Sequence, residues 1–203
     1  NNVNGAGYFH MNDSNTNVGG WKDSSMRKTL LGNSNSPTSP LANSLMAALP
    51  SDLRAVMKSV TKYTDNVGNA TGNVAGNVTV TTDYLFLLAE FEVFGARYYA
   101  NDYERNSQLQ YDYYKAGNSK IAYKHTAVGT TVWWWLRSPN YNNNNNFCNV
   151  NTSGGNNNNN AYYSAALLPG FYRYTVKWSS QAVKDDRCKR RDTSQGETPE
   201  TAL

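Results

Sequence analysis

The side chains that could support catalysis are few in this sequence, and they lie far apart. The chain has two histidines, His10 and His125. A base formed by His125 with Asp112 or Glu104 is imaginable, but no nucleophile motif such as G-x-S-x-G accompanies it. A lone histidine beside a lysine is more often exposed or structural than catalytic. We therefore predict that the protein has no catalytic residues and is not an enzyme.

The two cysteines, Cys148 and Cys188, do not form a metal-binding pattern either. They make no C-x-x-C pair, and neither histidine lies near them in the sequence. A structural zinc site takes four such ligands at characteristic spacings, so we predict no metal and no cofactor. One disulfide is an alternative, but we expect a free Cys148 packed beside Phe147.

Composition and charge favour recognition over metabolism. The 203 residues suit one domain, and the apolar and charged fractions are only 39% and 17%. Tyrosine, asparagine, serine and glycine are abundant, as in binding loops, although a loop-rich fold of any function is the alternative. The formal charge of +4 lies largely in Lys184–Arg191, so no nucleic-acid partner is expected. Because no apolar run is long enough to span a bilayer, we expect no direct membrane insertion.

Two runs of asparagine, Asn142–Asn146 and Asn156–Asn160, are the most unusual feature of the sequence. Consecutive amides cannot be buried without leaving polar groups unpaired, so we expect both runs to be exposed. A linker is a poor explanation, because the runs lie between the apolar segments Trp133–Leu136 and Leu167–Phe171. A calcium site would need carboxylates, and this region has none. The runs therefore favour a displayed contact surface with interchangeable residues.

The segments around the runs must supply the frame that holds them. Thr130–Leu136 is rich in residues that favour strands. Alternation places Trp134 on one face of that strand and Trp133 and Trp135 on the other. Two filled faces predict a central strand, which Pro139 ends because proline cannot donate to a ladder.

Helical spacing is confined to the N-terminal part. We expect one helix from Asp23-Ser24 to Leu30 and a second from Leu41 to Val60 that is interrupted at Pro50. The other expected elements are strands at Asn77–Thr82, Tyr84–Leu88, Phe147–Asn151 and Phe171–Trp178, a helical turn at Glu90–Gly95 and a loop at Lys115–Gly129. This order predicts an α+β domain over residues 1–178, with two N-terminal helices, a small, mostly antiparallel sheet and long loops. Residues 179–203 are charged and lack an apolar stripe, which predicts a flexible tail.

Several motifs together resemble a known family. Trp134-Trp135-Leu136-Arg137-Ser138-Pro139 is followed by the asparagine-rich segment, by Phe147–Asn151 and by Pro169-Gly170-Phe171. This sequence resembles the variable proteins of diversity-generating retroelements, phage and bacterial proteins whose C-terminal part has a C-type-lectin fold. Gly20–Ser24 and Phe86–Leu88 resemble the wider phage and bacterial domain family with the same WWLRSP signature. The resemblance covers residues 19 to 171.

The resemblance implies which residues vary and which form the scaffold. In that family a reverse transcriptase copies a template repeat with errors at adenines, and asparagine codons are rich in adenine. The implied variable, ligand-binding positions, in a segment over about residues 133–171, are Tyr141, Asn142, Asn143, Asn144, Asn145, Asn146, Asn149, Asn151, Asn156, Asn157, Asn158, Asn159, Asn160, Tyr162, Tyr163 and Ser164. The implied scaffold residues are Trp134, Trp135, Leu136, Phe147, Val150 and Phe171. Replacing Asn143 or Asn158 by Tyr should then change stability by less than about 0.5 kcal/mol.

The resemblance also implies a function. We expect a non-enzymatic, hypervariable protein that binds a protein or glycan on a host-cell surface from a phage tail tip. A bacterial surface-displayed adhesin is the alternative, and an enzyme related to the formylglycine-generating enzymes is a weaker one, because those enzymes need a reactive cysteine pair. The expected location is the virion or the cell surface. A homo-oligomer is compatible with both, and it would be a trimer on a phage tail.

Overall fold

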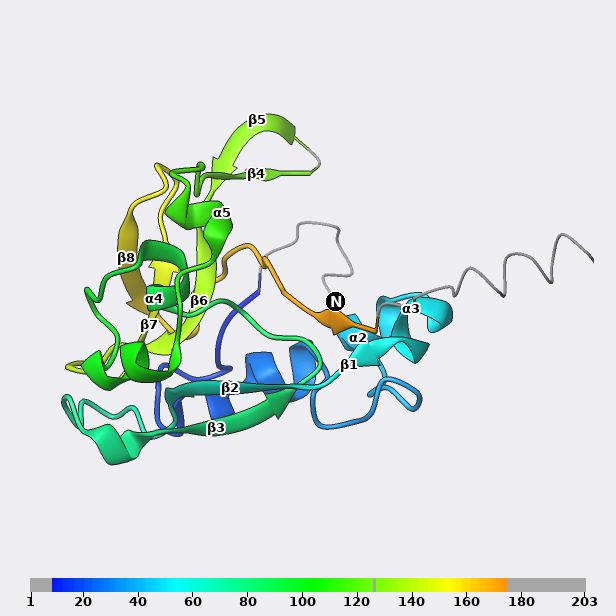
Figure 1. The fold of residues 1–203 in the computed structure, drawn as a ribbon, viewed down its shortest axis with the longest axis horizontal. Coiled ribbons are helices and arrows are strands. Elements are labelled where there is room, and N and C mark those ends of the chain that lie inside the picture. Colours follow the sequence, from blue (N-terminus) through cyan, green and yellow to red (C-terminus); the bar gives the residue numbers. More distant parts are fainter. Residues whose placement is uncertain (1–8, 126, 175–203) are drawn as a thin grey trace, which may run out of the picture. The chain divides into compact units, whose positions relative to one another are not determined.

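The computed structural model describes residues 9–125 and 127–174, and the chain divides into two compact units between Arg173 and Tyr174. Every element described below belongs to the first unit (Figure 1). The expected tail over residues 179–203, which includes Cys188, and the part of the expected strand at 175–178 lie outside the described residues.

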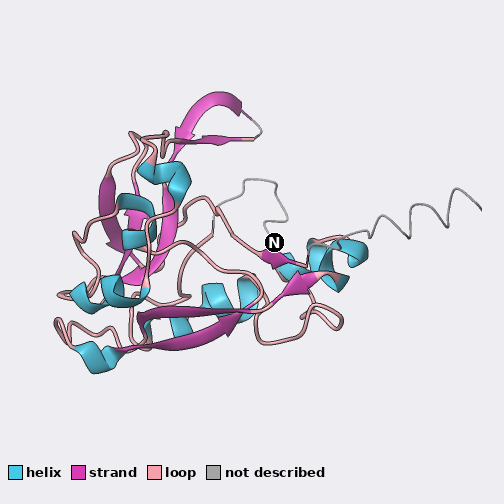
Figure 2. Ribbon diagram, viewed as in Figure 1, coloured by secondary structure: helices cyan, strands magenta, loops and turns pink. Residues whose placement is uncertain are grey.

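The helical elements are short turns that interrupt a chain of strands and loops (Figure 2). They are α1 (Gly20–Asp23), the π-helical turn η1 (Met26–Leu30), α2 (Leu45–Ala48), α3 (Ser51–Ala55), the 3-10 turn η2 (Ala75–Asn77), α4 (Glu90–Phe94), the 3-10 turn η3 (Asp102–Ser107) and α5 (Asp112–Lys115). In the described part of the chain, no helix is long and apolar enough to cross a membrane.

The strands pair antiparallel in several small sheets. The prediction of an α+β fold is therefore confirmed, but the prediction of a single sheet is wrong. The strands are β1 (Met57–Lys58), β2 (Val60–Asp65), β3 (Val78–Asp83), β4 (Ala122–Lys124), β5 (Ala127–Val132), β6 (Trp134–Pro139), β7 (Asn146–Val150), β8 (Asn156–Asn160) and β9 (Tyr172–Arg173). The pairs are β1–β9, β2–β3 and β4–β5, and β6, β7 and β8 form a three-stranded sheet in that order.

The three-stranded sheet separates two apolar clusters. Trp135 and Phe147 lie in one cluster, whereas Trp134, Cys148 and Val150 lie in the other, and all five side chains are fully buried. The predicted alternation of the tryptophans across two faces is therefore confirmed. The predicted strand itself is divided, because the chain leaves strand geometry at Trp133 and re-enters it at Trp134.

The second N-terminal helix was predicted to reach Val60, but the helical structure ends at Ala55. Its apolar stripe continues to Val60, but Met57 pairs with Arg173 and Val60 pairs with Asp83 as strand residues. Val56 and Val60 are β-branched, a type that favours strands. Distant pairing partners thus decide the local structure, and helical periodicity alone did not reveal them.

Two other segments also differ from the prediction. The expected loop Lys115–Gly129 contains β4 and the first residues of β5, which pair as a hairpin. Tyr84–Leu88 is buried at Leu85, Phe86 and Leu87, as expected, but it is not a strand. Its main chain is satisfied by separate partners instead, including a two-way bridge between Phe86 and Gly170 at 3.0 and 2.7 Å.

Candidate functional site

The first asparagine run lies in the loop between β6 and β7 and ends at the first residue of β7, and a side chain from outside the run holds it. The Nδ2 atom of Asn17, which is fully buried, lies 2.6 Å from the carbonyl oxygen of Asn143 and 2.9 Å from that of Asn146. The carbonyl of Asn140 lies 3.3 Å from the same nitrogen. The loop is therefore organised around an amide donor that the run itself does not supply.

Main-chain bonds fix the rest of this loop. The N–H of Asn17 donates to the carbonyl of Asn144 at 2.9 Å, and the N–H of Ala161 donates to the carbonyl of Asn145 at 2.8 Å. The carbonyl of Tyr141 accepts a hydrogen bond from Gly72 at 3.0 Å. Bonds of this kind do not depend on which side chains the loop carries.

Asn17 is itself held in place. Its Oδ1 atom accepts a hydrogen bond from the N–H of Asn69 at 2.8 Å. Gly68 lies against its main chain with a φ of 62°, and a Cβ atom there would lie 2.1 Å from the Asn17 carbonyl oxygen. Only glycine fits that position, both because of the positive φ and because of the close approach.

The second asparagine run is a strand, β8, at one edge of the three-stranded sheet, and its side chains are half-buried rather than exposed. The prediction that both runs are exposed is therefore wrong for β8, and in the first run only Asn142 and Asn144 are exposed. The ladder with β7 satisfies much of the main chain, and the amides pair with one another. The Oδ1 atom of Asn158 accepts hydrogen bonds from Asn140 at 3.0 Å and from Asn146 at 2.5 Å, which ties the two runs together.

The exposed and half-buried side chains of these runs and of their neighbours form what we call the amide surface. Asn142 and Asn144 are exposed, and within the described residues their side chains have no hydrogen-bond partner. Tyr162 and Tyr163 are 45% and 43% exposed, with ring centroids 4.8 Å apart, and Ser164 is exposed beside them. The other members are half-buried side chains at Tyr141, Asn145, Asn146, Asn156, Asn157, Asn159 and Asn160.

Three of the predicted ligand-binding asparagines have structural roles instead. Asn143 Oδ1 accepts from the main-chain N–H groups of Asn145 and Asn146 at 2.7 and 3.0 Å. Asn151 Oδ1 accepts from two N–H groups in the tight turn before β8, both at 2.9 Å. Asn158 joins the two runs. These side chains form turns or cross-links of the kind for which asparagine is suited.

Asn149 and Phe171 correct the prediction in opposite directions. Asn149 was expected to contact a ligand, but its side chain is fully buried and neither of its amide atoms has a hydrogen-bond partner in the described chain. It points to the same face of β7 as Phe147, toward the core. Phe171 was expected in the scaffold, but its side chain is 42% exposed.

Arg137, in the middle of the WWLRSP motif, is the buried centre of the frame. It is fully buried, and its guanidinium forms a bidentate pair with Glu92 at 2.5 and 2.9 Å. Thr64 Oγ1 and the carbonyls of Leu87 and Tyr63 accept its remaining N–H groups at 2.8, 2.9 and 3.4 Å. All five guanidinium donors therefore have acceptors, as burial of a charge requires. Burial alone would raise the pKa of Glu92, but the charge and hydrogen bonds of Arg137 outweigh it and lower that pKa.

A second buried carboxylate, Glu104, joins the same region to β2. It accepts hydrogen bonds from Asp65 N–H at 2.9 Å, Ser138 Oγ at 2.6 Å and Gln108 Nε2 at 3.1 Å. Burial raises the pKa of Glu104 to about 7, although these donors act in the opposite direction. Sequence patterns gave no sign of this cluster, because its members come from elements far apart in the chain.

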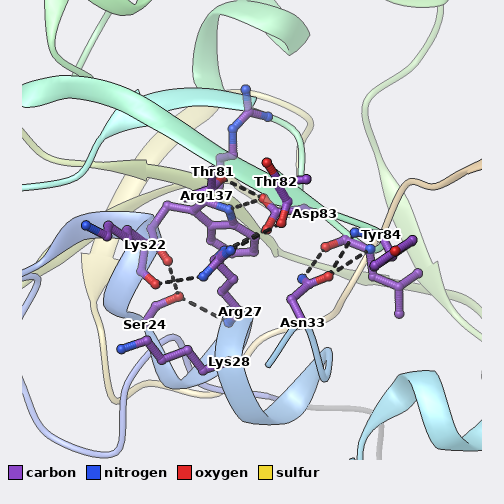
Figure 3. A network of polar contacts seen from close by, with 12 residues as sticks. Lys22, Ser24, Arg27, Lys28, Asn33, Thr81, Thr82, Asp83, Tyr84 and Arg137 are labelled. Carbon is purple, nitrogen blue, oxygen red and sulfur yellow. Dashed lines mark hydrogen bonds and ion pairs between the residues drawn. The ribbon is translucent and has the colours of Figure 1, made fainter. Parts of the chain in front are cut away.

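A third polar network fixes the N-terminal turns to the end of β3. Figure 3 shows Arg27 and Asn33 pointing toward Asp83 and Tyr84. Asp83, fully buried, accepts from Arg27 Nε at 2.6 Å and from Trp21 Nε1 at 2.9 Å. Asn33 Oδ1 accepts from the N–H of Tyr84 at 2.9 Å. The network supports the frame and contributes nothing to the amide surface directly.

The residues considered for catalysis are not brought together. His125 is exposed on the β4–β5 hairpin, and Glu104 is occupied by its buried partners. Cys148 is a free, buried thiol, and burial raises its pKa well above the ordinary value, which disfavours the reactive thiolate. Among the residues that the structure describes, no group of three or more His, Cys, Asp or Glu side chains could hold a metal ion.

The fold and the site define a small α+β domain that displays an amide surface on a tryptophan-containing frame. A family model described as "Domain of unknown function (DUF6273)" matches residues 4–172, which is most of the chain, so the protein belongs to that family. No curated protein and no solved structure matches the chain.

Proposed function

We propose that the protein is a non-enzymatic binding protein and that the amide surface is its contact site. The observation that carries the proposal is the Asn17 side chain, which holds the first asparagine run by its carbonyls. Because main-chain acceptors fix the loop, the side chains of Asn142 and Asn144 are left to contact a partner. Tyr162 and Tyr163 add aromatic area of the type that dominates many interfaces.

The resemblance given by the WWLRSP motif carries the proposal further. On that basis the fold is of the C-type-lectin type, a retroelement diversifies the surface, and the protein binds a host-cell surface protein or glycan from a phage tail. A bacterial surface-displayed adhesin would use the same surface. The structure favours a smaller set of varied contacts, because Asn143, Asn151 and Asn158 are hydrogen-bonded within the fold and Asn149 is buried.

A binding experiment tests the contact site. The full chain and the triple variant Asn142→Ala, Asn144→Ala, Tyr163→Ala are compared for binding to whole bacterial cells and to glycan arrays. We expect the triple variant to weaken binding about tenfold or more, since aromatic contacts supply much of an interface's energy. The matched control replaces Thr79, Val80 and Tyr123, which are exposed outside the amide surface. Equal losses in both variants would refute the proposed site.

The DNA beside the gene tests the diversification. A near-copy of the codons for Trp133–Phe171 that differs only at adenines, next to a reverse transcriptase gene, is the expected finding. Without such a copy, the proposal of retroelement diversification fails, while the contact site is still decided by the binding experiment.

A further inference from the structure

The two-stranded ribbon of β2 and β3 has one edge that no strand covers (Figure 1). The register shows which main-chain groups lie on that edge. The N–H of Asn66 donates to the carbonyl of Asn77 at 2.9 Å, and these residues stand opposite each other when the β2–β3 register is continued. Opposite residues of an antiparallel pair alternate between bonded and non-bonded. Val78, Val80 and Thr82 therefore turn their N–H and C=O groups away from β2.

The other edge of the ribbon, on β2, is occupied from within the chain. By the same alternation, Tyr63 and Asp65 turn their main-chain groups outward there. The N–H of Asp65 donates to Glu104 at 2.9 Å. The carbonyl of Tyr63 accepts from Gln108 Nε2 at 2.8 Å and from Arg137 Nη2 at 3.4 Å. The open edge of the ribbon is therefore that of β3.

Some of the outward groups of β3 already have partners. The N–H of Val78 donates to the carbonyl of Ala75 in the preceding turn, and the carbonyl of Thr82 accepts from Arg27 Nη2 at 3.3 Å. The carbonyl of Val78, both main-chain groups of Val80 and the N–H of Thr82 have no hydrogen-bond partner within the part of the chain that the structure describes. Two donors and two acceptors are thus free, a set that an identical edge could satisfy.

β3 lacks the features that usually protect an edge strand from pairing. Residues 78–82 include no proline and no charge, and their register with β2 has no bulge. They are all valine or threonine, which favour strands. On the solvent side, Val80 and its opposite neighbour Tyr63 are 50% and 39% exposed. Because this face carries no charge, two copies can meet there without bringing like charges together.

We propose that the β3 edges of two copies of this chain pair antiparallel about a two-fold axis at Val80, which joins the two ribbons into a four-stranded sheet. Val80 then exchanges both main-chain bonds with Val80 of the second copy, and the N–H of each Thr82 donates to the carbonyl of Val78 in the other copy. These four bonds use every free group, whereas a register shifted by two residues leaves some unpaired. The contact is self-complementary, as a symmetric dimer requires. It does not rest on the function proposed for the amide surface.

Sedimentation velocity of the full chain between about 5 and 500 μM tests the pairing. The contact is small, so we expect a monomer–dimer equilibrium with a Kd of about 10–100 μM. Val80→Pro removes an N–H that makes no bond inside the chain, so the variant should fold, as circular dichroism checks, and remain monomeric. Val80→Lys sets two like charges opposite each other and should weaken association at least about tenfold. Val80→Ala keeps the main-chain groups and, as the control, should dimerise within about threefold of the wild type.

Cross-linking tests the register. Opposite residues of a bonded pair have Cα atoms about 5.5 Å apart, which is within the range of a disulfide. In a Cys188→Ser background, Val80→Cys should give a covalent dimer on mild oxidation. Leu109→Cys, at a position outside β3 that is 85% exposed, is the control for random collision.

Three results would each overturn the proposal. The first is a chain that stays monomeric up to about 500 μM, the top of the concentration range in which so small a contact should associate. The second is association of Val80→Pro and Val80→Lys as tight as that of the wild type, which would place the dimer contact elsewhere. The third is cross-linking of Val80→Cys no faster than that of Leu109→Cys.

Discussion

Arg137 and Glu92 form a bidentate ion pair inside the protein, with Nη1–Oε2 and Nη2–Oε1 distances of 2.5 and 2.9 Å. Each residue comes from a different part of the chain, one from β6 and the other from α4. The pair therefore connects β6, the strand that precedes the first asparagine run, to α4. The arginine of the WWLRSP motif is thus a structural residue, and its charge is not available to a ligand.

Removing the charge of Arg137 should destabilise the fold strongly. Arg137→Met leaves Glu92 buried without its partner, which should cost about 3–5 kcal/mol. Urea unfolding measures the loss. Lys28→Met is the control, since Lys28 pairs with Asp23 at 2.7 Å on the exposed surface and should contribute less than about 1 kcal/mol. Similar losses in the two variants would contradict the central role of the buried pair.

Asn17 should control the order of the first asparagine run. Asn17→Ala removes the donor shared by the loop carbonyls and should cost about 1–3 kcal/mol. Amide hydrogens of residues 140–146 should exchange faster, as measured by hydrogen exchange with mass spectrometry. Asn15→Ala is the control, because Asn15 is exposed two residues away. If exchange in the loop is the same in both variants, Asn17 does not hold it.

Neighbouring asparagines in the run should respond differently to the same change. Asn144→Tyr should alter the free energy of unfolding by no more than about 0.5 kcal/mol, because the side chain is exposed. Asn143→Tyr should cost about 1 kcal/mol, since two main-chain N–H groups lose their acceptor. Thermal melts of both variants give the comparison. A loss as large for Asn144 as for Asn143 would show that the run is not organised as described.

Asn149 should tolerate an apolar replacement better than any other asparagine of the segment. Its buried amide has no partner in the described chain, so Asn149→Val removes an unpaired polar group from a strand and should stabilise by about 1 kcal/mol. Chemical denaturation measures the change. Marked destabilisation would mean that the amide has a partner, such as a bound water, that valine cannot replace.

Glu104 should make stability depend on pH. Its pKa in the fold is about 7, above the ordinary 4.5, so the folded state holds the proton more tightly than the unfolded chain. The resulting stabilisation is complete below about pH 4.5 and is lost as the pH rises through about 7, by at most about 3 kcal/mol. Glu92 has a lowered pKa, so its contribution is lost only at lower pH.

Unfolding at pH 5 and pH 8 checks this slope. Between these values the wild type should lose stability, whereas Glu104→Gln should show a flatter dependence, whatever its absolute stability. If the two slopes are equal, Glu104 is already ionised throughout this range.

The strand and core residues of the frame could be predicted from the sequence because their signals are local. Alternation in Trp133–Leu136 gave the two faces of β6, and the glycine after Phe94 marked the end of α4, where Gly95 has a φ of 66°. The helix expected up to Val60 failed because β9 and β3, which pair with that segment, lie distant in the chain.

The amide surface could be predicted from the sequence only in outline. The asparagine runs indicated a polar surface, but exposure was inferred from composition, which cannot show that amides satisfy one another across two strands, as Asn158 does with Asn140 and Asn146. Asn17 was missed because an isolated asparagine in a glycine-rich loop has no distinctive pattern. The structural role of Arg137 could likewise not be predicted, because nothing in the sequence identifies the groups that accept its hydrogen bonds.

The anchoring of the first run by one amide has a consequence for how this segment can evolve. Asn17 reaches the carbonyls of Asn140, Asn143 and Asn146, which recur at every third position along the loop. Substituting the residues between them preserves this spacing. Adding or deleting a residue would instead move one of the carbonyls out of reach of the Asn17 amide. The loop should therefore tolerate substitutions but not insertions or deletions.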